Sequence, residues 1–114
     1  MNIGIVGSRT FNDYKLMDLY LSILFSDITS KIISGGAKGA DTFAEGYAKD
    51  KGILSEVILP DWNKHGKAAG MIRNTEIVKK SDIIVAFWDG ESRGTKDTID
   101  KARKAKKPTF IVYF

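Results

Sequence analysis

Hydrophobic residues follow two different spacings along this chain of 114 residues. Short apolar runs bounded by turn-forming residues are typical of buried β-strands. Longer segments with apolar residues three or four positions apart are typical of amphipathic helices. The short runs predict five strands, at Asn2–Val6, Lys31–Ser34, Glu56–Leu59, Ile83–Trp88 and Thr109–Tyr113.

The segments between these strands each carry one apolar face and are predicted to be helical. Asp13 is placed to cap the first helix, and Gly52 is placed to end the second. The four helices are expected at Tyr14–Phe25, Ala40–Lys51, Lys67–Lys80 and Thr95–Lys106. Their inward residues are expected to be, in chain order, Met17, Tyr20, Leu21 and Leu24; Phe43, Ala44, Tyr47 and Ala48; Met71, Thr75 and Val78; and Ile99, Ala102 and Ala105.

Strands that alternate with helices specify an α/β fold with a parallel sheet. We expect one Rossmann-like, three-layer domain over residues 1–114, with its five strands in the order 3-2-1-4-5. In that order the topological switch point lies between the first and fourth strands. Ligands of such folds bind there, beyond the carboxyl ends of the strands.

Composition excludes several kinds of site. The chain has no cysteine, so it has no disulfide framework, and its single histidine, His65, excludes a histidine-rich metal centre within one chain. The N-terminal residues do not resemble a signal peptide, and no segment approaches the roughly 20 apolar residues of a membrane span. We therefore expect a cytoplasmic protein with no membrane association and no metal or cofactor.

The net charge of +4 is local. Five cations lie close together near the C-terminus, and without them the chain has 13 basic and 14 acidic residues; they are Lys101, Arg103, Lys104, Lys106 and Lys107. Such a run could bind nucleic acid. It is also typical of a solvated helix end, and Asp97–Lys101 and Asp100–Lys104 have the spacing of favourable helical ion pairs. We favour the helix-end interpretation.

Arginine is used sparingly, since the chain has fourteen lysines and four arginines. Three of the four, Arg9, Arg73 and Arg93, lie in glycine-bearing segments that follow predicted strands. A planar guanidinium is required where an anion is held through two oxygens in fixed geometry. This distribution indicates a phosphate or carboxylate site at the strand ends.

The loops after the first two strands are the first candidates for that site. Gly7 permits close backbone approach, and Ser8 and Arg9 can contact a phosphate. The next loop, Gly35-Gly36-Ala37-Lys38-Gly39, precedes a helix and exposes backbone N–H groups to an anion. It is neither a Walker A loop nor a Gly-x-Gly-x-x-Gly motif. Asp41 follows it and could cap the helix or accept a ribose hydroxyl.

Two later segments complete the candidate site. After the third strand, Trp62 could stack on a base, and Arg73 and Asn74 lie in the first turns of a helix. The fourth strand leads into a second possible anion site that comprises Trp88, Gly90, Ser92, Arg93, Gly94 and Thr95. Ordinary strand-to-helix connections are the structural alternatives for both segments.

Catalytic chemistry has few candidates in this sequence. No Ser-His-Asp or Cys-His arrangement is apparent, and no acidic cluster has metal-ligand spacing. Asp41 and Glu45, one helical turn apart, are the candidate catalytic residues if the protein is an enzyme.

Taken together, these motifs resemble the SLOG superfamily of Rossmann-like domains, named after the Smf/DprA and Lonely Guy proteins, and in particular its YspA-like branch. The resemblance runs nearly end to end and is carried by spaced motifs in one order: Gly7–Phe11, Gly35–Asp41, Asp61-Trp62, Gly66–Gly70, Arg73-Asn74, Ala86–Gly90 and Ser92–Thr95. It implies a sheet that binds nucleotides or nucleotide-derived ligands in the strand-end crevice, with Arg73 facing phosphate or ribose.

Members of the superfamily include nucleoside monophosphate glycosidases, sensors of ADP-ribose-type signals and DNA-binding DprA. The Lonely Guy enzymes carry a Pro-Gly-Gly-x-Gly-Thr loop followed by a catalytic glutamate. The loop that ends at Asp41 lacks the proline and the threonine, and its acidic residue is displaced, which argues against glycosidic cleavage.

Three functions follow as hypotheses. The preferred one is a module that senses or sequesters a nucleotide-derived small molecule, such as an ADP-ribose-like or cyclic nucleotide. The second is a hydrolase of an N-glycosidic or related ribose bond, and the third is a nucleic-acid binder. The thin apolar face of the last helix and the dimers common among SLOG proteins favour a homo-oligomer.

Overall fold

The computed structural model describes all residues from Met1 to Phe114 and has the expected architecture. Five parallel strands form one sheet in the order β3-β2-β1-β4-β5. The strands are β1 (Asn2–Gly7), β2 (Lys31–Ser34), β3 (Leu54–Val57), β4 (Ile83–Trp88) and β5 (Thr109–Tyr113). The principal helices are α1 (Tyr14–Phe25), α2 (Ala40–Lys51), α4 (Ala69–Lys80) and α5 (Arg93–Lys104). The α/β fold and the strand order predicted from the sequence are confirmed.

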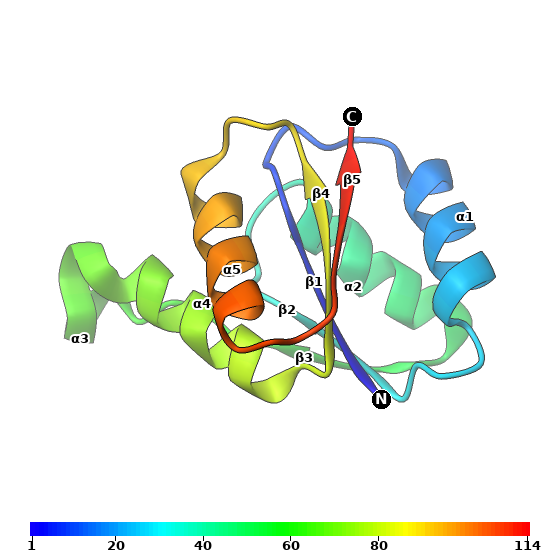
Figure 1. Ribbon diagram of the computed structural model, residues 1–114, viewed down its shortest axis with the longest axis horizontal. Helices are drawn as coiled ribbons and strands as arrows, with labels where there is room; N and C mark the ends of the chain where they lie inside the picture. Colours follow the sequence, from blue (N-terminus) through cyan, green and yellow to red (C-terminus); the bar gives the residue numbers. More distant parts are fainter.

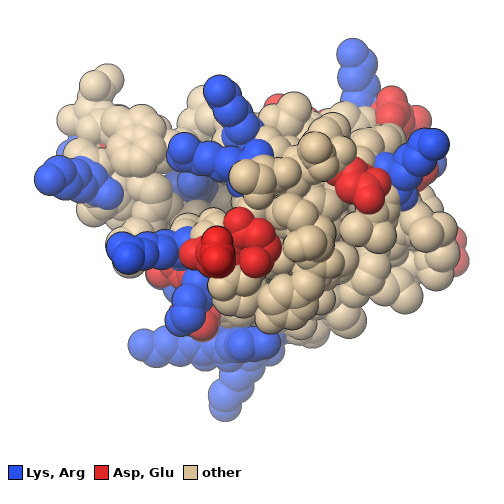
Figure 2. Space-filling view, turned by 90° about the horizontal axis from the view of Figure 1, so that it is seen from above, with Lys and Arg blue, Asp and Glu red and all other residues tan.

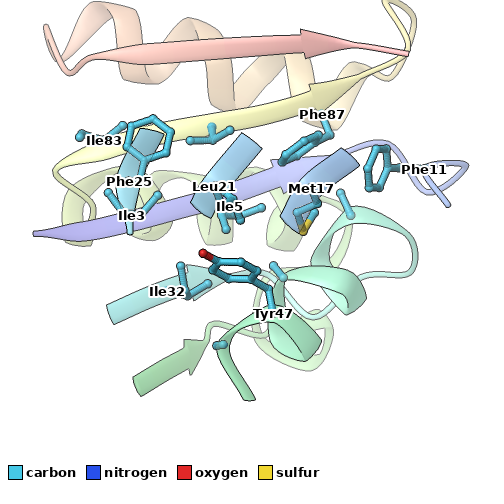
Figure 3. Packing of buried hydrophobic residues seen from close by; sticks show 14 residues of the cluster. Ile3, Ile5, Phe11, Met17, Leu21, Phe25, Ile32, Tyr47, Ile83 and Phe87 are labelled. Carbon is cyan, nitrogen blue, oxygen red and sulfur yellow. The ribbon is translucent and has the colours of Figure 1, made fainter. Parts of the chain in front are cut away.

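Helices cover both faces of the sheet (Figure 1). On one face, α1 and α2 pack against alternate residues of the central strands, including Ile3, Ile5 and Phe87 (Figure 3). On the other face, Val6 and Ala86 pack against α4 and α5. Because β1 and β4 are buried on both faces, their sequences are continuous apolar runs. None of the helices has the length and apolar character required to span a bilayer.

The third strand lies two residues earlier than expected. Leu54 and Ser55 are exposed, but their backbones pair with Lys31 and Ile32 of β2. The apolar residues Ile58 and Leu59, which suggested a strand, instead follow it. The bounds of this edge strand follow its backbone pairing with β2, and the pattern of apolar side chains does not predict them.

The third helical segment is divided, contrary to the single helix expected at Lys67–Lys80. A short α3 (Trp62–His65) begins after Asp61, whose carboxylate accepts a hydrogen bond from Lys64 N at 3.0 Å. A 3₁₀ turn, η1 (Gly66–Ala68), separates α3 from α4. In Figure 1 the α3 segment projects from the body of the domain.

The inward faces of the helices differ in part from prediction. Met17 and Leu21 are buried as expected, but Leu24 is half exposed and Phe25 takes its place. In α4 the buried stripe contains Asn74, Ile77 and Val78, whereas Met71 is 56% exposed. Of this stripe the sequence pattern identified Val78 but not Asn74 or Ile77, because the stripe includes a polar residue, Asn74.

The last helix starts at Arg93, two residues earlier than expected, and Ser92 is its N-cap. Ser92 Oγ accepts a hydrogen bond from Thr95 N at 3.4 Å. The predicted Asp97–Lys101 ion pair is present at 2.9 Å. Asp100 pairs with Lys96 at 2.9 Å, so the expected Asp100–Lys104 pair does not form.

Phe11 is an anchor of the larger core, because it contacts the rings of Phe43, Phe87 and Phe114 and is 1% exposed. We predict that Phe11→Ala lowers the free energy of unfolding by about 3–5 kcal/mol, through lost burial and the cavity that remains. The control Leu19→Ala, at a side chain that is 59% exposed, should change it by about 0.5 kcal/mol or less. Urea denaturation of both variants tests this, and equal effects would contradict the assignment of Phe11 to the core.

Candidate functional site

A cavity of about 400 Å³ lies beyond the carboxyl ends of the central strands. It opens at the switch point between β1 and β4, on the face covered by α4 and α5. Figure 2 shows this edge of the molecule, where basic side chains stand around the hollowed part of the surface. The lining residues come from the end of β1, three loops and three helices: Val6, Gly7, Ser8, Arg9, Thr10, Ala37, Asp41, Arg73, Asn74, Ile77, Asp89, Ser92, Gly94, Thr95 and Thr98.

Ser8 fixes the loop after β1. Its N–H donates to Phe87 O at 2.9 Å, and its carbonyl accepts from Phe11 N at 3.1 Å and Ala40 N at 3.4 Å. Its hydroxyl, which is buried, accepts from Asp89 N at 3.1 Å. These bonds hold the first loop against both the start of α2 and the loop after β4.

Gly39 allows this junction to close. Its φ of +77° is in the region that favours glycine, and a Cβ there would lie 2.5 Å from Ser8 O and 2.6 Å from Arg9 O. Gly39 therefore serves close packing between two loops, and it does not line the cavity.

Arg73 reaches from α4 to the glycine loop after β2. Its Nη1 donates to Gly35 O at 2.5 Å, and its Nε donates to Asn74 Oδ1 at 2.9 Å. A Cβ on Gly35 would lie 2.5 Å from Nη1, so a side chain at this position would displace the guanidinium from where it lies. Two of the five guanidinium N–H groups are used in this way, and the others are available to a ligand.

Asn74 connects α4 with the start of α5. Its Nδ2 donates to Gly94 O at 3.2 Å and to Asp97 Oδ2 at 3.1 Å, while its Oδ1 accepts from Arg73. Both ends of the buried amide are thus engaged by the protein. Asn74 lines the cavity, but its geometry is that of a residue that positions Arg73 and the α5 N-terminus.

The loop before α5 is ordered by Asp89. Its Oδ1 accepts hydrogen bonds from Glu91 N and Ser92 N, both at 2.9 Å, and these bonds lower the pKa of Asp89. Ser92 then caps α5, and Gly94 and Thr95 bring the N-terminus of that helix to the cavity. A helix N-terminus presents partial positive charge and N–H donors to an anion.

Four charged side chains line the cavity, those of Arg9, Asp41, Arg73 and Asp89. Arg9 is exposed, forms no hydrogen bond or ion pair within the protein, and lies close enough to lower the pKa of Arg73, for which burial is the larger cause. Asp41 is 6% exposed, and its Oδ2 accepts from Ala37 N at 3.0 Å. Burial raises the pKa of Asp41 to about 6, although the Ala37 hydrogen bond and the charge of Arg73 oppose the shift. Asp41 therefore closes the loop ahead of α2, and it is Gly39 that occupies the N-cap position.

The structure brings together ten of the eighteen residues proposed as ligand contacts: Gly7, Ser8, Arg9, Ala37, Asp41, Arg73, Asn74, Ser92, Gly94 and Thr95. The other eight lie outside the cavity: Gly35, Gly36, Lys38, Gly39, Trp62, Trp88, Gly90 and Arg93. Glu45, the second candidate catalytic residue, does not line it either.

Their positions explain the exclusions. Trp62 is 56% exposed on the projecting α3, and Trp88 packs against Tyr113 with 5.7 Å between ring centroids. Lys38, Gly90 and Arg93 are exposed. A role for any predicted residue in binding stays a prediction.

Five lining residues were not proposed from the sequence: Val6, Thr10, Ile77, Asp89 and Thr98. Thr10 and Asp89 belong to the motifs Gly7–Phe11 and Ala86–Gly90, and their position in these motifs is the signal that could have identified them. Ile77 and Thr98 lie inside helices on the same face as Asn74 and Thr95, and their helical spacing is the signal that could have identified them.

Comparison with known proteins agrees with this architecture. The sequence model of the YspA, cpYpsA-related SLOG family matches residues 1–65, which is more than half of the chain. The chain therefore belongs to this SLOG family, as the motifs predicted.

The Gene 61 protein of Mycobacterium phage D29 is 39% identical over 83 residues, which are 68% of this chain and 66% of the phage protein.

Solved structures show the same fold. DNA processing protein A (DprA) from Streptococcus pneumoniae superposes with a TM-score of 0.77 and 21% identity over 96% of this chain and 49% of its own. DprA from Helicobacter pylori, described for its single-stranded DNA binding mode, gives 0.75 and 22% identity over 97% of this chain and 64% of its own. The chain thus spans about half to two thirds of the length of these relatives.

The buried carboxylate of Asp41 should make stability depend on pH. Because its pKa is raised from 3.8 to about 6, the folded protein retains a proton that the unfolded chain releases, and stability falls as pH rises between these values. A shift of two pKa units corresponds to about 3 kcal/mol at most. We predict that Asp41→Asn, which keeps an acceptor for Ala37 N, is more stable than the wild type by about 1–3 kcal/mol at pH 7.5 and equally stable near pH 4.

Urea denaturation at pH values from 4 to 7.5 measures this difference directly. If the difference in free energy of unfolding between the two proteins does not change with pH, the pKa of Asp41 is not raised in the folded protein.

Proposed function

We propose that the protein binds a nucleotide or nucleotide-derived small molecule through its phosphate in the crevice at the strand ends, as a sensing or sequestering module. The observation that carries the proposal is the convergence of Arg9, Arg73 and the N-terminus of α5 on one cavity. Two guanidinium groups beside helix N–H donors form a strong site for a phosphate. Membership of the SLOG family supports the same ligand class.

Binding without turnover is favoured by the surroundings of the two candidate carboxylates. Asp41 is buried against the backbone of its own loop, and Glu45 lies outside the cavity. Water activation between two carboxylates, as in the glycosidase mechanism, requires both groups to flank the reacting bond. The hydrolase hypothesis would therefore rest on Asp41 alone.

Nucleic-acid binding is the second candidate, because the H. pylori DprA structure is described for binding single-stranded DNA. The C-terminal cations support it only in part. Lys101 is engaged by Asp97 and by Met71 O at 2.7 Å, and Lys107 donates to the carbonyls of Val78 and Ser81 at the end of α4. Arg103, Lys104 and Lys106 stay exposed and are available to a polyanion. Formation of a homo-oligomer stays a prediction.

Arg9→Ala tests the site without disturbing the fold, since this side chain has no partner within the protein. We predict that it weakens AMP or ADP-ribose binding by about 10- to 100-fold, as expected for lost charge-assisted hydrogen bonds. Arg73→Ala should weaken binding at least as much. The matched control is Arg103→Ala, an exposed arginine at the far end of α5, which should leave the affinity within about twofold.

Calorimetry gives these affinities, and chromatography of the filtrate and of the ligand released on denaturation shows whether the nucleotide is intact. Intact ligand agrees with a binding module, whereas free base or a new ribose phosphate would identify a hydrolase. Equal affinities of the Arg9→Ala and Arg103→Ala proteins would show that the ligand does not bind in the crevice.

The nucleic-acid hypothesis makes a separate prediction. If Arg103, Lys104 and Lys106 neutralise phosphates, the logarithm of the DNA association constant should fall with the logarithm of salt concentration with a slope of about −2 for single strands. Fluorescence anisotropy with an oligodeoxythymidine measures that slope. A slope near zero, or a slope unchanged when all three residues are replaced by alanine, would show that these residues do not bind DNA.

A further inference from the structure

We propose that two copies of the chain form a dimer in which their β5 strands pair antiparallel across a two-fold axis and join the two sheets into one. The inference concerns a surface outside the crevice and does not depend on the proposed function. It rests on three features of this side of the molecule, namely an unprotected edge strand, an apolar helix face beside it and the lack of charged side chains on both of these surfaces.

The two edges of the sheet differ in how they are protected. An edge strand presents unpaired N–H and C=O groups, and proteins usually protect it with charged side chains, proline or a short length. At the β3 edge, Glu56 forms ion pairs with Lys31 at 3.2 Å and with Lys80 at 2.6 Å. The β5 edge, Thr109–Tyr113, contains neither a charged residue nor a proline. β5 is therefore suited to pairing with another strand.

The free backbone groups of β5 belong to alternate residues. Ile84 N donates to Pro108 O at 3.0 Å, and Ile84 is paired with Thr109 in a parallel register. Since hydrogen bonds to one neighbour alternate along a strand, the N–H and C=O groups of Thr109, Ile111 and Tyr113 face away from β4. An antiparallel contact centred on Ile111 uses all three, because Ile111 then faces its own copy and Thr109 faces Tyr113 of the partner subunit.

The side of α1 towards β5 is apolar. Phe25 of α1 contacts Phe110 of β5 with 5.3 Å between ring centroids, and Figure 1 shows the helix beside the strand. The polar residues Asp18 and Ser22 are turned to α2. The opposite side of the helix carries large apolar or aromatic residues at helical spacing: Leu16, Tyr20, Ile23 and Leu24. A surface helix normally presents polar residues to solvent, so an apolar face beyond the buried one indicates a further contact.

The helix face and the strand together form an apolar patch of the size that an interface needs. Its most exposed members are between 38% and 70% exposed: Ile23, Leu24, Phe110, Tyr113 and Phe114. These side chains expose on the order of 500 Å², which is more than half of the roughly 800 Å² that each partner contributes to a stable interface. The half-buried side chains of α1 beside them and the backbone of β5 extend the patch.

The charge and symmetry of the patch favour a second copy of the chain as the partner. Near a two-fold axis each residue meets its own copy, so a charged side chain there would face a like charge. The patch contains no Lys, Arg, Asp or Glu. A two-fold axis perpendicular to the sheet also keeps both α1 helices on the same face of the joined sheet, where their apolar sides can meet beside the paired strands.

Sedimentation equilibrium of the intact chain at rising protein concentration measures the association. We expect a species of twice the chain mass that dissociates on dilution. A species of single chain mass at every concentration, or a series of ever larger species, would overturn the proposal.

The variants Tyr113→Pro and Tyr113→Ala separate strand pairing from side-chain packing. Both remove the ring that packs on Trp88, but only proline removes the outward N–H, and neither affects the hydrogen bonds to β4. The dimer then loses two hydrogen bonds, one from each copy. We expect the dissociation constant of the Tyr113→Pro dimer to be about 5- to 150-fold higher than that of the Tyr113→Ala dimer. Equal constants would show that β5 does not pair.

The variant Ile23→Glu tests the helix face, at a side chain that is 70% exposed and therefore tolerant of substitution in the monomer. The matched control is Leu59→Glu, which is 68% exposed and follows β3 at the other edge of the sheet. We expect Ile23→Glu to raise the dissociation constant at least about 10-fold, because a charge would be placed in an apolar contact, and the control to leave it within about twofold. Dissociation by Leu59→Glu in place of Ile23→Glu would place the interface at the β3 edge and contradict the proposal.

Amide hydrogen exchange reports the strand pairing itself. Ile111 N–H should become more protected as protein concentration rises, because it is bonded only in the dimer. Val57 N–H is the control at the other edge: Ile58 N donates to Ser34 O, so the N–H of Val57 faces away from β2 and should exchange rapidly at every concentration. Protection of Ile111 that does not change with concentration would rule out the paired strands.

Discussion

The crevice depends on the way the chain is fixed where β1 ends. The backbone and side chain of Ser8 form four hydrogen bonds, which reach Phe11, Ala40, Phe87 and Asp89. Because Ser8 is buried, loss of any of these bonds would leave a polar group without a partner, at a cost of about 1–3 kcal/mol. The loops after β1 and β4 and the start of α2 are therefore held as one unit, and Arg9, the next residue, extends from a rigid base.

A second set of bonds joins the other half of the crevice to this unit. Arg73 links α4 to the loop after β2 through Gly35, and Asn74 links α4 to α5 through Gly94 and Asp97. Donors that are already oriented bind an anion without the entropic cost of ordering flexible side chains. If the crevice binds an anion as proposed, the hydrogen bonds that Arg73 and Asn74 make within the protein contribute to affinity indirectly, because they fix the geometry of the donors in advance.

The sequence predicted those elements whose bounds depend on burial of apolar side chains. It failed for elements whose bounds depend on backbone pairing or on buried polar residues. The central strands β1 and β4 were placed correctly because both of their faces are apolar, whereas the edge strand β3 was misplaced. Ten of the proposed residues line one cavity because the carboxyl ends of parallel strands lie at one edge of the sheet. The individual contacts were harder to predict: Gly35 and Gly39 make room for neighbours, and Trp62 and Trp88 point elsewhere. No sequence spacing distinguishes a glycine that touches a ligand from one that accommodates an arginine.

The buried charge of Asp41 lowers the stability of the fold at neutral pH, so the presence of a carboxylate in the crevice requires an explanation. An asparagine at this position could accept the same hydrogen bond from Ala37 N without a buried charge, so the charge itself has no role in closing the loop. Burial lowers the pKa of the Arg73 guanidinium, and the attraction of Asp41 partly offsets that effect. A carboxylate that destabilises the fold above its pKa and lines the same cavity as Arg73 is consistent with the proposed binding function.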